Sequence, residues 1–451
     1  MRDSSFTGRI GVAREDVTPP VGIYCRNWGA AKHDAAEGVH RPLTLTALTL
    51  QPDRQAKPLV LVDADLGWWA DLPFERKFRR RVLAELGLDP PQYILAFSHT
   101  HSAPPLCDPE PHWHGGELLR AYTERVYAAI LEATRKALAA AEPATLEWHS
   151  GRCSLASNRD LRDGKRMVCG YNPEIRADDT LVVGRVTDAA GKIIATIVNY
   201  ACHPTTLAWQ NKLISPDFVG AMRETMQQET GAPAMFLQGA SGELSPRYQY
   251  VGDTGVADAH GRQLGFAALS TLADMEPAGH EFVYDGIVES GTPLATWKRQ
   301  PYPVSPELGA MVRTVELPLK DWPAAAELKG QYETCPDRTI AERLRRKLRI
   351  REALGDDKTY PLEVWVWRVG DAVIVGSLVE AYSCLQQKLR SCFPERTIVW
   401  ILIHGSIGYL PPAPSYDEDV YQVWQTPFER GGLETLTDAA ENAVRALFSD
   451  E

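Results

Sequence analysis

Two histidines separated by one residue follow a strongly apolar segment of the chain. The letters ILAF lead directly into SHTHS, which contains His99 and His101. Imidazole nitrogens are ligands for zinc and other transition metals. Side chains at i and i+2 of an extended segment point to the same side, so both rings can reach one pocket. The pattern favours a metal site and leaves open whether one imidazole or both bind the ion.

Other chemically capable side chains also follow apolar, strand-like segments. These are His203, Ser245 and Tyr409, and Glu380 stands where a strand gives way to a helix. In α/β proteins, the loops after strands are where sites form, because the sheet holds the loop bases rigidly. A catalytic zinc ion takes about three protein N/O ligands and keeps one position for water. Two imidazoles and one carboxylate meet that requirement.

Three better-known hydrolase patterns fit poorly. A metallo-β-lactamase motif needs H-x-H-x-D-H, but Ala103 and Pro104 follow His101 here. An amidohydrolase barrel needs eight regular βα units, and the spacing of the strands is too irregular. The turn Gly239 to Glu243 lacks the G-x-S-x-G of a serine nucleophile elbow.

Strand and helix patterns alternate along the chain and predict an α/β fold with mixed β-sheets flanked by helices. Residues 156–180 read as a loop-rich stretch, and residues 281–320 as mixed, strand-like and proline-punctuated. The segments expected to form strands are 58–66, 92–99, 192–204, the start of 232–247 and one in 397–412; the segments expected to form helices are 72–86, 116–141, 215–231 and 257–274. Residues 362–390 are expected to form two strands and a helix.

Residues 321–355 form a polar, mostly helical insertion that is rich in arginine. A basic helix can bind polyanions, but Glu342 and Glu352 are interleaved with the arginines. This mixture favours a solvent-exposed helix face over a polyanion site.

The composition is that of a globular protein with a small-molecule partner. The 451 residues carry a formal net charge of -11, which argues against nucleic acid as the partner. No apolar run is long enough for a membrane span, and the N-terminus lacks the apolar core of a secretory signal, so we expect a cytoplasmic protein. The eight cysteines are scattered, without a C-x-x-C pair.

Seven motifs, taken in order, resemble the neutral/alkaline ceramidase family of zinc-dependent hydrolases, which cleave an N-acyl amide bond. They are SHTHSAP, SNRD, NYACHPTTL, GASGELSPR, GRQLG, GSLVEA and GYLPPAPSYDEDVYQV. The resemblance implies a ceramidase-like catalytic domain over residues 1–451, without the immunoglobulin-like C-terminal domain of true ceramidases. It also implies Zn²⁺ as the cofactor.

The resemblance also assigns roles to residues. It implies that His99, His203, Glu380 and Tyr409 bind zinc, and that His101, Arg159 and Ser245 are catalytic or lie close to the substrate. A zinc-activated water would then attack the carbonyl carbon, and direct attack by Ser245 is the mechanistic alternative.

Three functions stay open on these grounds. The first is a zinc-dependent hydrolase of a small N-acyl amide, the second an esterase or lactonase that uses the same site, and the third a ligand-binding homologue without turnover. The loops 25–34 and 108–117 favour a small polar substrate over a two-chain lipid. They supply the pocket candidates Arg26, Trp28, His112, Trp113 and His114.

Overall fold

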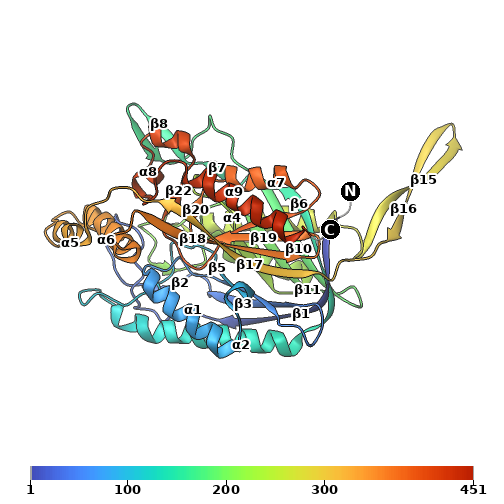
Figure 1. The fold of residues 1–451 in the computed structure, drawn as a ribbon, viewed down its shortest axis with the longest axis horizontal. Helices are drawn as coiled ribbons and strands as arrows, with labels where there is room; N and C mark the ends of the chain where they lie inside the picture. Colours follow the sequence, from blue (N-terminus) through green and yellow to red (C-terminus); the bar gives the residue numbers. More distant parts are fainter. Residues whose placement is uncertain (1–2, 450–451) are drawn as a thin grey trace.

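A computed structural model describes residues 3–449. Two β-sheets pack face to face, and helices cover the outer face of each sheet, so the molecule is layered as helix, sheet, sheet and helix (Figure 1). This arrangement confirms the predicted α/β class with mixed sheets flanked by helices.

The larger sheet has eight strands, with parallel pairing only near its two edges. Its order is β13 (Ala234–Gln238), β11 (Ile193–Tyr200), β10 (Thr180–Asp188), β6 (Glu142–Arg152), β1 (Ser4–Asp16), β3 (Thr44–Gln51), β4 (Leu59–Ala64) and β5 (Tyr93–Phe97). The smaller sheet has the order β17 (Leu308–Pro318), β18 (Thr359–Val369), β19 (Ala372–Ser377) and β21 (Ile398–Leu402).

Both faces of the larger sheet are buried, which explains its near-continuous apolar strands. In β4, Leu59 and Leu61 belong to the core shared with the smaller sheet, whereas Val60 and Val62 pack toward the helices on the other side. Because successive side chains of a strand point to opposite faces, this one strand contributes to both hydrophobic cores.

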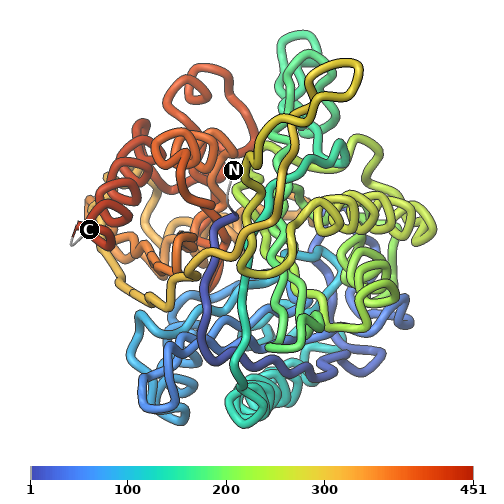
Figure 2. Tube along the Cα trace, turned by 90° about the vertical axis from the view of Figure 1, so that its right-hand side faces the viewer, coloured from blue at the N-terminus to red at the C-terminus, as the bar shows by residue number. Residues whose placement is uncertain are grey.

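Helices on the larger sheet are α1 (Leu72–Leu86), α2 (Leu119–Ala140), α3 (Phe218–Thr230) and α4 (Thr254–Ala273). The smaller sheet is covered by α7 (Cys384–Cys392) and α9 (Gly432–Leu447). Figure 2 shows the yellow-green α4 and the red α9 on opposite sides of the strands. Among the described residues, no helix is long and apolar enough to cross a membrane.

Local chemistry sets several of these boundaries. Asp71 caps α1 by accepting a hydrogen bond from the Phe74 amide, and Gly87 ends it in the left-handed region at φ 66°. Helix α2 approaches β1 closely because Gly11 lacks a side chain: a Cβ there would lie 1.8 Å from the carbonyl oxygen of Ala137.

Residues 156–180 differ from the predicted loop. They contain β7 (Ala156–Asn158), β8 (Asp160–Asp163) and β9 (Arg166–Cys169). Strand β7 pairs with β14 (Leu244–Pro246), a partner distant in sequence, which is why a local pattern did not reveal it. Further short pairs are β2 (Gly38–Val39) with β12 (Leu213–Ile214) and β20 (Glu380–Ala381) with β22 (Tyr409–Leu410).

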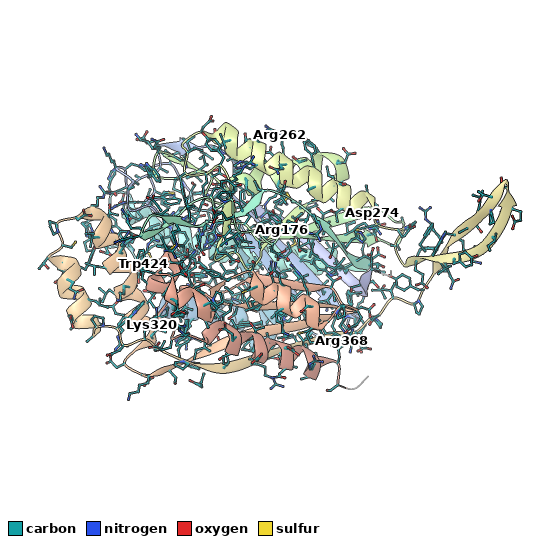
Figure 3. All side chains as sticks on the ribbon, turned by 90° about the horizontal axis from the view of Figure 1, so that it is seen from above. Arg176, Arg262, Asp274, Lys320, Arg368 and Trp424 are labelled. Atoms are coloured by element: carbon teal, nitrogen blue, oxygen red, sulfur yellow. The ribbon has the colours of Figure 1, made fainter. Side chains whose placement is uncertain are left out.

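Two segments extend from opposite ends of the layers (Figure 1). At one end lie α5 (Ala325–Glu333) and α6 (Arg338–Leu354), the two helices of the predicted insertion. At the other end β15 (His280–Ser290) and β16 (Thr292–Pro301) form a projecting hairpin, also seen from above in Figure 3. Three short 3₁₀ helices (Pro90–Gln92, Gly116–Leu118, Ala413–Asp417) and α8 (Tyr421–Gln425) complete the described elements.

Candidate active site

The predicted site residues come from both sheets. His99 and His101 follow β5, and His203 follows β11, so all three imidazoles come from the larger sheet. Glu380 follows β19 and Tyr409 follows β21, in the half built on the smaller sheet. Parallel pairing of β20 with β22 sets Glu380 directly beside Tyr409.

Backbone strain accompanies the first histidine. His99 adopts φ 66°, a left-handed conformation that is uncommon for a residue with a side chain. Its amide donates to the carbonyl oxygen of Leu66 at 2.9 Å. Such strain persists only where the surroundings hold it, and it is common at functional sites.

One carboxylate oxygen faces two imidazoles. Glu380 Oε2 lies 3.0 Å from His203 Nε2 and 3.4 Å from His99 Nε2. The other oxygen, Oε1, accepts a hydrogen bond from the Ser406 hydroxyl at 2.7 Å. Ser406 thus supplies a hydroxyl that holds this carboxylate in place.

The tautomer of His203 tests whether this site fits a cation. His203 Nδ1 lies 2.7 Å from the carbonyl oxygen of Ser241, which can only accept, so Nδ1 carries the proton. In the neutral ring, the Nε2 lone pair then points at an anionic oxygen of Glu380. Two electron-rich atoms at 3.0 Å need a cation between them, either a proton or a metal ion. The residues therefore fit a metal, and the Ser241 carbonyl would orient the His203 ring by accepting a hydrogen bond from its other nitrogen.

His101 is half-buried and lies between two indole rings. Its ring centroid lies 5.1 Å from that of Trp28 and 4.9 Å from that of Trp68. Neither nitrogen of His101 has a hydrogen-bond partner among the described residues, and the same holds for His99 Nδ1. Nitrogens of His99, His101 and His203 lie within 4.8 Å of one another, a spacing that could hold a metal ion.

Burial favours the neutral form of His101 and of His203, and the neighbouring histidines favour the ionised form of Glu380. Burial, followed by the Arg159 guanidinium, lowers the pKa of His203 to about 4. Burial and His99 place the pKa of His101 well below its usual value. Burial alone would raise the pKa of Glu380, but His99 and His203 more than offset it and hold that pKa well below the usual range. These are the protonation states that bind metals.

Arg159 joins the predicted site directly. Its Nη2 donates to the Gly242 carbonyl at 2.7 Å and to the Tyr409 hydroxyl at 3.3 Å, and it lies 3.4 Å from His203 Nε2. The side chain is 3% exposed. A buried guanidinium at this place can donate to an oxyanion.

Ser245 lies in the neighbouring strand, β14, and is fully buried. Its hydroxyl accepts a hydrogen bond from Gln249 at 2.7 Å. The residue before it, Leu244, accepts the backbone amide of His203 at 3.0 Å. Ser245 is thus next to the residue whose carbonyl bonds the His203 amide, but Ser245 itself is absent from the cavity wall. Its catalytic role stays a prediction.

A cavity of about 110 Å³ lies against these residues. His99, His101, Glu380 and Tyr409 form part of its wall. Of the loop residues predicted to line it, Arg26 and Trp113 do so, and Trp28 packs on His101 instead. His112 and His114 are exposed and contribute nothing to this wall.

The arginine-rich helix is a correction to the sequence interpretation. One face of α6 is not solvated: Glu342 and Arg345 are buried, and together with Arg346 and Arg349 they line the cavity. The spacing of these four residues, at i, i+3, i+4 and i+7, is the signal of a helix face that meets protein. Arg343 and Glu352 lie on the exposed face, where the prediction holds.

Comparisons with known proteins show what this chain is similar to. No protein-family model matches the chain. It is 26% identical over 255 residues to the neutral ceramidase of Pseudomonas aeruginosa, covering 53% of this chain and 37% of that protein. It is 25% identical over 244 residues to the neutral ceramidase of Drosophila pseudoobscura pseudoobscura, covering 50% and 33%. The aligned part thus spans about a third of the length of these relatives.

Solved structures agree over a longer span. A ceramidase complexed with C2 matches with a TM-score of 0.70 and 17% identity, over 100% of this chain and 76% of that chain. The chain is therefore similar to neutral ceramidases in both sequence and fold, which confirms the resemblance drawn from the motifs. The crystal structure of neutral ceramidase from Pseudomonas aeruginosa also has a TM-score of 0.70, at 18% identity over 99% and 75% of the two chains.

Proposed function

We propose that this protein is a zinc-dependent hydrolase that cleaves the C–N bond of a small N-acyl amide. The observation that carries the proposal is Glu380 Oε2, which faces the Nε2 atoms of both His203 and His99. In this proposal His99, His203, Glu380 and Tyr409 hold the metal. Bound zinc would supply an acidified water and a Lewis acid for the carbonyl oxygen.

The chain's own residues divide the remaining work. His101 is neutral and neither ring nitrogen has a partner among the described residues, so it can take a proton from the attacking water and then deliver it to the leaving nitrogen. Arg159 Nη2 is close enough to His203 and Tyr409 to donate to oxygen that becomes anionic there. Helix α6 and the indoles of Trp28 and Trp68 limit the access of bulk water, which strengthens these electrostatic interactions.

Metal content and a substrate panel test the proposal. Purified protein should contain about one zinc per chain, and a chelator should abolish hydrolysis of a small N-acyl amide, with recovery when zinc is returned. The same panel should include matched esters and lactones. Turnover of esters alone would replace the amidase proposal with an esterase. Bound zinc with no turnover of any member would favour a ligand-binding homologue.

A further inference from the structure

We propose that the substrate carries an anionic group, a carboxylate, and that guanidinium groups of α6 bind it, with Arg346 the principal contact. The substrate class is then a small N-acyl amino acid or a similar amide acid. This inference rests on the proposed function, because it concerns the same cavity.

The cavity wall has more positive than negative charge. Four arginines line it, namely Arg26, Arg345, Arg346 and Arg349. Glu342 Oε1 accepts from Arg345 at 2.8 Å and from Arg346 at 3.0 Å, so one carboxylate serves two guanidinium groups.

The remaining partners do not restore the balance. Glu110 pairs with Arg349 at 3.1 Å and lies 3.8 Å from Arg345. Arg26 donates to the backbone carbonyls of Trp28 and Gly29. The third carboxylate of the region, Glu380, faces the imidazoles. Among the described residues, Glu342 in the wall and Glu110, which is not part of it, are therefore the two carboxylates that serve the four guanidinium groups, and an anionic ligand would complete the balance.

Two of these arginines, Arg26 and Arg345, are buried, and Arg346 and Arg349 are half-buried. Arg345 is 9% exposed, and its Nε has no hydrogen-bond partner among the described residues. Excess buried positive charge carries a desolvation cost, which a bound carboxylate would offset. Guanidinium binds carboxylate with paired, charge-assisted hydrogen bonds, so this donor set suits that ligand.

Arg346 connects the anion site to the catalytic residues. Its guanidinium carbon lies 5.6 Å from the centre of the Trp68 ring, and that ring lies 4.9 Å from the ring of His101. One aromatic ring therefore separates Arg346 from the proposed proton donor. Arg159, not α6, lies beside the imidazoles, so a group bound at Arg346 is distinct from the acyl carbonyl at the metal ligands.

Size supports the same class. Ordinary ligand pockets measure about 300 to 1,000 Å³. The cavity here measures about 110 Å³, which suits a small amide acid better than a lipid with two long chains.

The test compares N-acetyl amino acids with their carboxamides, which have the same shape and no charge. For Arg346→Gln, we expect the Kd and KM of the acids to rise about 10- to 100-fold, with the carboxamides little changed. Arg346→Lys should fall between, because it keeps the charge and loses the paired donors. The matched control is Arg343→Gln, which changes an exposed residue of the same helix whose guanidinium lies over the ring of Trp424.

The outcomes separate this inference from the proposed function. Equal binding of acids and carboxamides by the unaltered protein, or equal effects of the Arg346 and Arg343 variants, would overturn the anion site. Failure to bind any N-acetyl amino acid, or turnover confined to uncharged long-chain amides, would overturn it as well. The unaltered protein could instead bind the acids selectively, lose that binding in Arg346→Gln, and hydrolyse no amide. That result would uphold the anion site and overturn the proposed hydrolase activity. Circular dichroism and zinc content verify that each variant folds.

Discussion

His99 and His101 lie one residue apart but have different surroundings. His99 Nε2 faces the Glu380 carboxylate at 3.4 Å, whereas His101 lies between indole rings and has no hydrogen-bond partner among the described residues. These two neighbours in the sequence thus have different environments, and in our proposal His99 holds the metal while His101 acts on the substrate, as the family resemblance implies.

We therefore expect the alanine variants of these two histidines to differ. His99→Ala should lose bound zinc and activity together, because a ligand is removed. His101→Ala should retain zinc while turnover falls about 10²- to 10⁴-fold, the usual range for loss of a general acid or base. Metal analysis and steady-state kinetics on the same preparations measure both. Loss of zinc from His101→Ala would make His101 a ligand, as the three-histidine group would also allow.

Ser406 gives a second prediction at the scale of one side chain. Its hydroxyl holds Glu380 Oε1 at 2.7 Å, so Ser406→Ala should loosen the carboxylate without removing a ligand. We expect zinc affinity to fall about 10- to 100-fold, as is typical when such a supporting hydrogen bond is lost. Ser406→Thr keeps the hydroxyl and is the control. Competition with a chelator of known affinity measures the change, and equal affinity in the two variants would contradict the prediction.

At the scale of elements, a buried ion pair joins α3 to the larger sheet. Arg223 Nη1 lies 2.7 Å from Asp63 Oδ2, and Nη2 lies 3.0 Å from Asp65 Oδ1. All three side chains are nearly inaccessible to water. Helix α3 begins shortly after His203, so this pair fixes one side of the frame around that ligand.

Breaking the pair should cost stability without directly touching the site. Arg223→Met leaves two buried carboxylates unpaired, and we expect the free energy of unfolding to fall by about 3 to 5 kcal/mol. Lys57→Ala, which breaks the exposed pair with Asp89, should change it by less than about 1 kcal/mol. Urea unfolding followed by circular dichroism compares the two. Similar losses of stability in the two variants would show that burial does not determine how much each ion pair stabilises the fold.

Sequence patterns predicted some elements well and others poorly, for physical reasons. The α3 boundaries, between the Asp217 cap and Gly231, depend on local chemistry and were predictable. The buried face of α6 was not, because Glu342 and Arg345 suit water or a polar cavity equally well, and only the tertiary neighbour decides. Strand β7 was missed because its partner, β14, is remote in the chain.

The residues of the candidate site also include some that the sequence patterns could identify and others that they could not. His99 and His203 could be found from their places after apolar strands. The pairing of Glu380 with Tyr409 joins segments that are distant in sequence, and Arg159 gave no local signal, so those assignments depended on the family resemblance. Nothing in the sequence motifs predicted that α6 would form a wall of the cavity.

At the scale of the whole molecule, the candidate ligands link the two sheets. Imidazoles from the larger sheet meet Glu380 and Tyr409 from the half built on the smaller sheet. An ion bound there would hold both halves at once, so metal binding should contribute to the stability of the entire fold.

Chelation should therefore lower the melting temperature. A ligand present at about 100 times its Kd stabilises the native state by about 2.7 kcal/mol, which for a chain of this size is a shift of several degrees. Scanning calorimetry with and without chelator measures it. The His99→Ala variant should not respond. An unchanged melting temperature in the unaltered protein would mean that the two halves do not share an ion.

The projecting hairpin is the opposite case, an extension that the core does not need. Phe282, Tyr284 and Trp297 are each about half exposed, and the rings of Phe282 and Trp297 stack at 5.7 Å on the arm itself. Their burial adds little to the main cores, so the arm should be dispensable for folding.

Replacing residues 283–298 by Asn-Gly joins Phe282 to Arg299, which are paired in register. We expect the melting temperature to change by less than about 3 °C, because no core residue is lost. Tyr302→Ala, which removes a buried ring whose hydroxyl bonds Ser5 at 3.1 Å, should be clearly destabilising. A concentration-dependent loss of stability in the shortened protein would contradict this and identify the arm as a contact between copies.

The two-residue ladder between β20 and β22 sets the spacing of positions 380 and 409 independently of the side chains found there. Main-chain hydrogen bonds, not the side chains, hold positions 380 and 409 side by side. Neighbouring residues such as Leu378, Val379 and Ser406 can then be exchanged while Glu380 and Tyr409 stay in place. Substitutions in the cavity wall can therefore change the substrate while the backbone pairing keeps Glu380 and Tyr409 at the same spacing.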